Sequence, residues 1–294
     1  MIKRASLARS PAFAAAAVLL AGLALAAPAV SAQEKKNGLL GPWTATAEVS
    51  YVVTGGNTST SALSLGTSFS RKWTNDALLF KTYILKSNAT TTTRTAQGTV
   101  DDFDILEEKV TRKVSENYVL AGQYDRRVSK KLTGQAGLSW DRNRFAGVEN
   151  RVIATTGFGF SWVEKARTQV KSSAGMTYTL RQYVGQESES FAGFRFTFGA
   201  DQKILDSSKL TSQLVFDDNL KNASDWRLDW ANSATASISK SIALKMSLRT
   251  LYTHIPALQN LTLVDELGEP TGLTVPYPLK KLDTFLTTSI VINF

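Results

Sequence analysis

The sequence predicts an all-β fold: a transmembrane antiparallel up-and-down β-barrel of about twelve strands, preceded by a cleaved signal peptide. Three observations lead to it. Side chains alternate between apolar and polar with a period of two, most alternating segments span about ten residues or more, and Trp43 to Ile255 contains no proline. Tilted membrane strands need ~9–11 residues, whereas strands in globular proteins are most often about five or six residues long.

The chain begins with a secretory signal peptide. A positive start is followed by an apolar, alanine-rich stretch and then by the small residues Val30, Ser31 and Ala32, which form a cleavage site. An N-terminal membrane anchor is the alternative, and the shortness of the apolar stretch disfavours it. The predicted organisation is a signal peptide over 1–32, a periplasmic lead-in over 33–42 and an outer-membrane barrel over 43–294.

Twelve segments follow in order, and each is assigned as a strand because one side of it is apolar. The alternation is clearest in Trp43 to Val53, Leu63 to Phe69, Leu132 to Trp140, Phe158 to Trp162, Phe194 to Phe198 and Leu244 to Leu248. The predicted strands are 43–53, 59–71, 77–86, 113–125, 131–141, 151–163, 168–182, 191–200, 209–217, 226–238, 242–254 and 282–294.

The connections between these strands fall into two sets. Outer-membrane barrels have short periplasmic turns and longer outside loops. An even strand number then places both chain ends on the periplasmic side. The short set is 72–76, 126–130, 164–167, 201–208 and 239–241; the longer set is 87–112, 142–150, 183–190, 218–225 and 255–281, with a tight turn at 54–57.

The last strand carries a signal of its own. Its apolar residues Leu286, Ile290, Ile292 and Phe294 share one face, and Phe294 is the final residue. A terminal aromatic residue on an alternating strand is typical of outer-membrane barrels, where the barrel assembly machinery reads it. The alternative is a soluble secreted β-protein that binds an apolar ligand, but it would have to bury twelve long apolar faces.

The order of segments resembles a bacterial family of salt-induced outer-membrane proteins, built on a barrel domain of unknown function. The resemblance covers nearly the whole mature chain and implies the outer membrane of a Gram-negative bacterium, with no known catalytic residues. The stretches that carry it are Gly55 to Asn57 followed by Leu63 to Gly66, Asp141 to Phe145 with Arg151, Gly157 to Phe160, Gly175 to Tyr178, and Asp283 to Phe294.

The polar face of the strands is the candidate functional surface. Charges that face lipid are costly, so the alternation places the charged residues in the lumen. Most are basic, which favours a pore that prefers anions; alternatively, the arginines pair with the acidic residues and fill the interior. The predicted lumen-lining residues are Glu48, Lys171, Arg181, Arg195, Arg227, Asp229, Lys245 and Arg249.

The same face carries several glycines. Their missing side chains leave either a cavity or a bend in the wall, and the pattern alone does not decide between these. The glycines are Gly157, Gly159, Gly175, Gly193 and Gly199.

Composition excludes several kinds of chemistry. The 294-residue chain has no cysteine, which excludes disulfides and thiol catalysis, and one histidine, which excludes a multi-histidine metal centre. No cofactor is expected. The net charge is +9. It does not indicate nucleic-acid binding, because an exported protein rarely meets nucleic acid. The expected partners are outer-membrane lipid and the assembly machinery.

Two polar features remain. His254 could serve a lipid-modifying barrel enzyme as a base, but its strand position favours a place in the aromatic belt. The acidic run from Asp101 to Glu108 suits a divalent cation in composition, yet it lacks the spacing of an EF-hand and is expected to be a solvated loop.

Overall fold

A computed structural model describes residues 42–54, 58–98, 103–264 and 269–294. The predicted signal peptide lies outside the described residues, as does the lead-in except for its last residue, Pro42. No helix in the described residues is long and apolar enough to cross a membrane.

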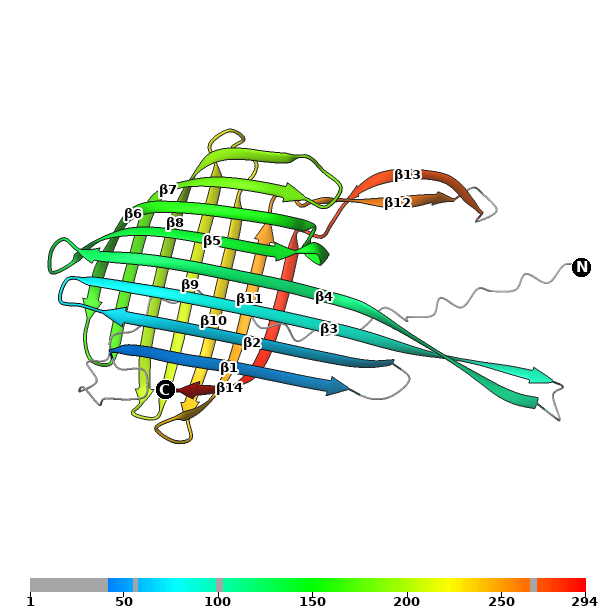
Figure 1. The fold of residues 1–294 in the computed structure, drawn as a ribbon, viewed down its shortest axis with the longest axis horizontal. Helices are drawn as coiled ribbons and strands as arrows, with labels where there is room; N and C mark the ends of the chain where they lie inside the picture. Colours follow the sequence, from blue (N-terminus) through cyan, green and yellow to red (C-terminus); the bar gives the residue numbers. More distant parts are fainter. Residues whose placement is uncertain (1–41, 55–57, 99–102, 265–268) are drawn as a thin grey trace, which may run out of the picture.

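Twelve antiparallel strands form a closed barrel, which confirms the predicted fold class (Figure 1). Neighbours in the chain pair with each other, and β14 closes the barrel between β1 and β11, with Val49 opposite Ile290. The barrel strands are β1 (Trp43–Thr54), β2 (Thr58–Lys72), β3 (Asp76–Gly98), β4 (Phe103–Arg127), β5 (Leu132–Asn143), β6 (Val148–Glu164), β7 (Thr168–Tyr183), β8 (Ser188–Leu205), β9 (Ser208–Asn219), β10 (Arg227–Ser237), β11 (Ile242–Thr253) and β14 (Leu282–Asn293).

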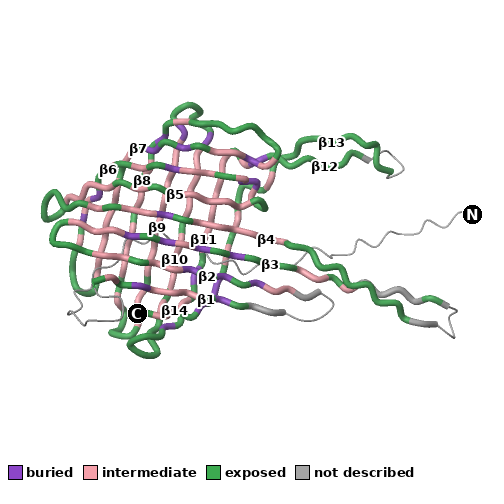
Figure 2. Tube along the Cα trace, in the orientation of Figure 1, coloured by how far each residue is buried: buried purple, intermediate pink, exposed green. Residues whose placement is uncertain are grey.

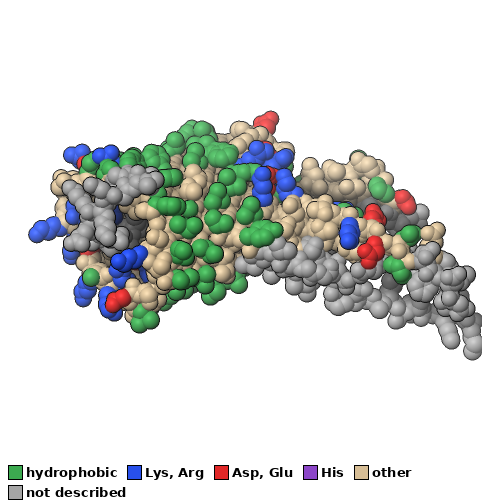
Figure 3. Space-filling view, turned by 60° about the horizontal axis from the view of Figure 1, so that its bottom comes forward, with side chains coloured by type: hydrophobic (Ala, Val, Ile, Leu, Met, Phe, Trp, Pro, Cys, Tyr) green, Lys and Arg blue, Asp and Glu red, His purple; other side chains and the backbone are tan. Residues whose placement is uncertain are grey.

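The apolar side chains of the strands lie on the outside. Phe158 is 60% exposed and Leu286 is 48% exposed, and neither lies in a shared dry interior. Figure 3 shows a band of hydrophobic side chains across the middle of the barrel on the face in view, and Figure 2 shows half-buried and exposed residues along most strands. Other members of the band include Leu63, Leu120, Leu138, Met176, Tyr178, Leu180, Phe194, Phe196, Trp230 and Leu248.

Strand β3 departs from the simple alternation because both of its faces are apolar. Phe80 and Ile84 are exposed, whereas Tyr83 and Leu85 are buried inside and pack against Val119 and Phe285. Lys81 shares this inner face and is 5% exposed. When both sides of a strand are apolar, its sequence has no alternation that could show which side faces the lumen.

The predicted loop over 87–112 is wrong. Strands β3 and β4 continue as a long two-stranded arm, paired from Asn88 opposite Lys113 to Gly98 opposite Phe103 (Figure 1). The arm is rich in threonine, which is β-branched and favours extended backbone; Thr90 and Thr111 hydroxyls bond across it at 2.8 Å. Exposure on both faces removes the alternation, so the pattern did not reveal these strands.

The prediction of a loop over 255–281 is also incomplete. This segment contains a second hairpin, β12 (Leu258–Val264) with β13 (Pro270–Pro278). Proline is disfavoured within a sheet, but an isolated two-stranded ribbon has edge positions where the missing N–H does no harm. A short 3-10 turn, η1 (Arg144–Ala146), lies between β5 and β6.

The two ends of the barrel differ. Short turns and both ends of the described chain lie at one end, where the Phe294 amide bonds to the Ala45 carbonyl at 3.0 Å. Lys and Arg side chains gather there in Figure 3. The opposite end bears the β3–β4 arm, the β12–β13 hairpin and the longer connections.

Candidate functional site

The lumen holds two adjoining cavities. The larger, of about 520 Å³, lies toward the long connections and is lined in part by η1 and by Ala257 and Leu279. The smaller, of about 220 Å³, lies toward the short turns. The same six residues line both cavities and mark their junction: Ala121, Ser139, Ile153, Arg195, Gln213 and Val215.

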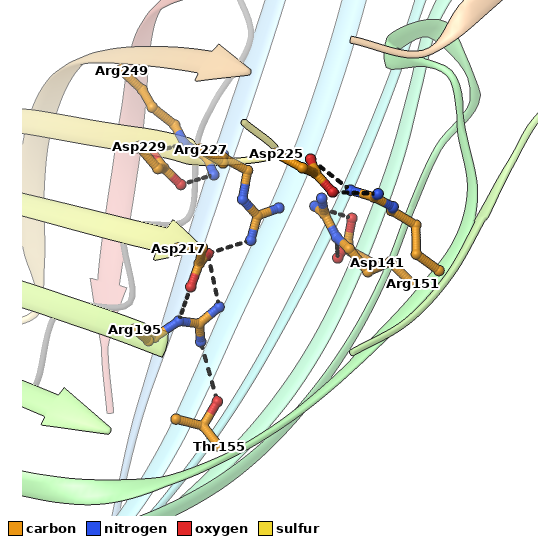
Figure 4. A network of polar contacts seen from close by, with 10 residues as sticks. Asp141, Arg151, Thr155, Arg195, Asp217, Asp225, Arg227, Asp229 and Arg249 are labelled. Carbon is orange, nitrogen blue, oxygen red and sulfur yellow. Dashed lines mark hydrogen bonds and ion pairs between the residues drawn. The ribbon is translucent and has the colours of Figure 1, made fainter. Parts of the chain in front are cut away.

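A row of ion pairs runs from strand to strand along the inner wall of the barrel beside this junction (Figure 4). Arg195, Asp217 and Arg227 stand directly opposite one another on β8, β9 and β10. Arg195 Nε donates to Asp217 Oδ1 at 2.5 Å, and Arg227 Nη2 donates to Asp217 Oδ2 at 2.5 Å. Arg195 also reaches Thr155 on β6 at 3.4 Å. One carboxylate therefore serves two guanidinium groups, which leaves the trio with a positive charge.

Two further cross-strand pairs line the larger cavity. Arg151 on β6 forms two bonds of 2.8 Å with Asp141 on β5. Arg249 on β11 donates to Asp229 on β10, with Nε to Oδ1 at 2.7 Å. Such charge-assisted, two-point pairs hold both side chains in a defined orientation.

Glu48 joins the first and last parts of the barrel. Its Oε2 accepts from Lys245 Nζ at 2.9 Å, and its Oε1 accepts from the Ser289 hydroxyl at 2.5 Å. These residues lie on β1, β11 and β14, so the cluster bridges the strands that close the barrel.

Arg181 links the connection between β9 and β10 to the rim of the barrel. Its Nη2 donates to Glu189 at 2.6 Å and to Asp225 at 2.7 Å, and its guanidinium lies 4.5 Å from the ring centre of Tyr183. Burial alone raises the pKa of Asp225, but hydrogen bonds from Arg181 and Asn219 outweigh it and hold the pKa below its ordinary value. The ionised carboxylate therefore fastens the β9–β10 connection.

The structure places the predicted lumen residues as follows. Lys171 and Arg195 line the smaller cavity; Arg195, Arg227, Asp229 and Arg249 line the larger one. Arg181 lies at the rim, and Glu48 pairs with Lys245.

Ten charged residues that line the cavities were not in the predicted set: Lys81, Asp125, Arg127, Asp141, Arg151, Glu164, Asp201, Asp217, Lys280 and Asp283. Asp141, Arg151 and Asp217 are the terminal residues of their predicted strands, and extending the alternation to both ends of each predicted strand would have found them. Lys81 had no such signal, because β3 is apolar on both faces. Asp141 and Asp217 pair with arginines, so the basic excess of the lumen is smaller than the predicted set implied.

The lumen glycines divide into two kinds. A Cβ on Gly175 would lie 2.3 Å from the carbonyl oxygen of Thr156, and one on Gly157 would lie 2.3 Å from that of Ala174. Gly193 is equally close to the backbone of Asp218, whereas Gly199 has no atom within 4 Å. Gly159 meets only the Gln135 side chain, at 3.0 Å. Three glycines therefore permit close approach of strands, and Gly199 opens onto free space.

His254 lies in an aromatic cluster at the rim. Its ring stacks on Trp226, with centres 5.3 Å apart, and Tyr252 lies at 6.4 Å. Its Nδ1 bonds to the carbonyl of Ser224 at 2.7 Å. Within the described chain its ring nitrogens meet no hydroxyl or carboxylate partner.

A metal site is not found in the described residues: no cluster of three or more His, Asp or Glu side chains could hold an ion there. Of the acidic run, Asp101 and Asp102 lie outside the described residues, and Glu107 and Glu108 are exposed on the β3–β4 arm.

Comparison with known proteins identifies a family and several barrels. A family model described as a protein of unknown function, DUF481, matches residues 47–262. The NanC porin aligns over 84% of this chain and 98% of its own, with 9% identity and a TM-score of 0.45.

Two other solved structures align at similar coverage. The anion-selective porin from Comamonas acidovorans covers 86% of this chain and 99% of its own, with 12% identity and a TM-score of 0.38. OmpT, an outer membrane protein of Vibrio cholerae, covers 86% and 96%, with 8% identity and a TM-score of 0.38. No curated protein matches the sequence.

Proposed function

We propose that this chain, which belongs to the DUF481 family of proteins of unknown function, is a passive pore in the outer membrane of a Gram-negative bacterium and catalyses no reaction. One observation carries the proposal: a closed barrel that is apolar outside holds two adjoining cavities inside, and charged side chains are among the residues that line both. The proposed solutes are small and hydrophilic, because Ser139, Arg195 and Gln213 present polar groups at the junction between the cavities.

The outer surface supports placement in a bilayer. A lipid core offers no hydrogen-bond partners, so a barrel must pair all of its backbone internally, which closure achieves. The aromatic cluster at Trp226 and Tyr252 suits the headgroup boundary. With the short turns in the periplasm, the long connections face outside the cell.

The last strand supports recognition by the barrel assembly machinery. Leu286 and Ile290 are exposed on the outer face of β14, the strand that completes the barrel, and Phe294, directly after this strand, is exposed as well. The salt induction in the name of the resembling family does not follow from any residue that the structure describes.

The charges of the lining favour a modest preference for anions. In the smaller cavity basic and acidic side chains are equal in number, whereas basic residues exceed acidic ones in the larger cavity. Rings of basic side chains bias conduction toward anions. The lining of the larger cavity includes Lys81, Arg151, Arg195, Arg227, Arg249 and Lys280 against Asp141, Asp217, Asp229 and Asp283.

Recording from planar bilayers tests the pore. The purified, heat-modifiable barrel is expected to produce discrete conductance steps, with a reversal potential that favours anions in a salt gradient. A folded barrel that conducts nothing contradicts the pore and leaves an envelope-maintaining structural role.

Replacing Arg195 with glutamine is expected to lower the anion preference. Arg195 is the charged residue among those that line both cavities, and Asp217 keeps Arg227 as a partner after the change. The anion-to-cation permeability ratio should fall by about two- to fivefold, because one charge a few ångströms from an ion contributes up to ~1 kcal/mol in water.

The control for this variant is Arg167→Gln. Arg167 pairs with Asp206 at an exposed turn, outside the lining of either cavity. It should leave the permeability ratio unchanged. Equal ratios for Arg195→Gln and the unmodified protein would show that ions do not pass Arg195.

A lipid-modifying enzyme that uses His254 is the second candidate, and the geometry disfavours it. The ring stacks on Trp226, and the hydrogen bond of its Nδ1 is to a backbone carbonyl. His254→Ala is therefore expected to leave the lipid composition of the membrane unchanged, as measured by mass spectrometry of extracted lipids. If the variant lacked a modified lipid that the unmodified protein produces, this result would support the enzyme hypothesis.

A soluble, ligand-binding β-protein is disfavoured by the exposed apolar band. Recovery of the protein from the periplasm without detergent would support that alternative.

A further inference from the structure

Charged side chains form a continuous group on the outer face of the barrel, at the rim that bears the long connections. Lys86 on β3 stands opposite Glu116 on β4, and Tyr118 on β4 stands opposite Arg142 on β5. The group continues into η1 and the start of β6. This rim patch consists of Lys86, Lys113, Glu116, Tyr118, Arg142, Arg144 and Glu149.

Each carboxylate of the rim patch serves two partners. Glu149 accepts from Arg142 Nη2 at 2.7 Å and lies 2.9 Å from Arg144 Nε. Glu116 accepts from Lys113 Nζ at 3.1 Å and from the tyrosine hydroxyl of the patch at 2.6 Å. Four cationic side chains therefore stand against two carboxylates, which gives the rim patch a net charge of +2.

The two arginines keep hydrogen-bond donors for a further anion. Their side chains are 37% and 52% exposed. A guanidinium carries five N–H donors, and the contact with Glu149 occupies only part of each group. Its planar fork suits the oxygens of a phosphate. A phosphate monoester carries a charge of about −1.5 to −2 at pH 7, which matches the net charge of the rim patch.

The rim patch adjoins the apolar band on the same outer face. Ile84, Leu120 and Leu138 are exposed there, two to four residues nearer the middle of their strands than the patch residues. Two to four residues of strand span about 7–13 Å. The cationic groups therefore lie just beyond the apolar surface, where a bilayer changes from acyl chains to headgroups.

We propose that the rim patch binds the phosphorylated headgroup of a lipid in the outer leaflet, with the acyl chains of that lipid along Ile84, Leu120 and Leu138. Charge complementarity selects the headgroup, because clusters of basic residues at a membrane surface attract anionic lipids. Continuity with the apolar band selects a lipid over a soluble phosphate, since only a lipid can contact both surfaces at once.

Binding of a defined lipid to the purified full chain tests the inference. In non-ionic detergent, lipid A, a glycolipid that carries two phosphate groups, should bind saturably, as measured by native mass spectrometry. Removing both phosphates from the lipid should weaken binding by about tenfold or more, because the charge-assisted hydrogen bonds are lost. Equal binding of the phosphate-free lipid would overturn the inference, since the acyl chains alone would then account for it.

Competition distinguishes the lipid from free phosphate. Inorganic phosphate has the headgroup chemistry but no acyl chains. At matched ionic strength it should leave as much lipid A bound as sodium chloride does. Displacement by phosphate beyond that of chloride would assign the rim patch to a soluble anion and overturn the inference.

The double variant Arg142→Gln with Arg144→Gln tests the residues. It should bind lipid A about tenfold or more weakly than the unmodified chain, because both guanidinium forks are removed. Exposed ion pairs contribute little to stability, so this variant should fold, and heat-modifiable migration checks that it does.

The matched control is the double variant Arg126→Gln with Arg167→Gln. It removes two positive charges from the opposite end of the barrel, where these arginines pair with Asp76 and Asp206. Its affinity for lipid A should stay within about twofold of the unmodified chain, because distant exposed charges are screened. Equal weakening in the two double variants, or no binding of lipid A by the unmodified chain, overturns the inference.

The inference rests on the proposed membrane location and orientation but not on conduction. Bilayer recordings of the same preparations separate the two. A barrel that binds lipid A at the rim patch and conducts nothing contradicts the pore alone, and a conducting barrel that binds no lipid A contradicts the lipid site alone.

Discussion

Gly175→Ala is expected to prevent the barrel from closing or to destabilise it severely. The added Cβ would lie 2.3 Å from the Thr156 carbonyl oxygen and 2.9 Å from Gly157 Cα. Both are backbone atoms of β6, so no side chain can turn aside to make room. Overpacking costs about 1–3 kcal/mol where neighbours can adjust, and here the strands themselves must separate. We expect a loss above about 3 kcal/mol in the free energy of unfolding.

Gly199→Ala is the matched control, because Gly199 lies on β8, the next strand, with no atom within 4 Å of the added Cβ. The measurement is urea titration of barrels refolded into vesicles, together with the heat-modifiable fraction on gels. Gly199→Ala should retain both. Equal unfolding midpoints for the two variants would mean that β6 and β7 are not closely apposed at Gly175.

Asp217→Asn is expected to be the most damaging substitution in the charged lumen. Asp217 is the acceptor for both Arg195 and Arg227, and the three side chains are 14–18% exposed. Removing the shared negative charge leaves two guanidinium groups close together without the carboxylate that both of them bond. Breaking a buried pair by removing one partner costs about 3–5 kcal/mol, and water in the adjoining cavities places the expected loss at the lower limit, about 3 kcal/mol.

The same change should raise the anion preference of the pore, because it adds net positive charge at the junction of the cavities. Asp206→Asn is the control. Its pair with Arg167 lies at a turn where the two side chains are 95% and 61% exposed, so the expected loss is within about 1 kcal/mol. Urea titration and reversal potentials measure the two effects. Unchanged stability in Asp217→Asn would show that the arginines find other partners.

The strands were predictable because the alternation between apolar and polar side chains is visible within the sequence of each single strand. Each residue of a crossing strand meets either lipid or lumen, so the period of two appears wherever the two media differ, as in Phe194 to Phe198. The fold class followed from that pattern and is confirmed by the closed barrel. The β3–β4 arm and the β12–β13 hairpin were missed because both faces of each meet the same medium.

The sequence predicted several of the residues that line the lumen, but it did not predict which of them form ion pairs with each other. Alternation identified Arg195 and Arg227 as inward residues, yet it says nothing about which strands are neighbours in register. Asp217 lies between them only because β8, β9 and β10 align at that position. The basic lumen expected from the sequence is therefore a paired one with a modest excess of positive charge.

Sequence alone determined that this chain is a barrel of long strands with its apolar faces turned outward, since each strand carries its own pattern. Only the tertiary structure decided which glycines permit close approach of strands, which carboxylates neutralise which arginines, and which residues line both cavities of the lumen. Those properties depend on the register and curvature of neighbouring strands, and a single strand's sequence does not contain the distance to its neighbour.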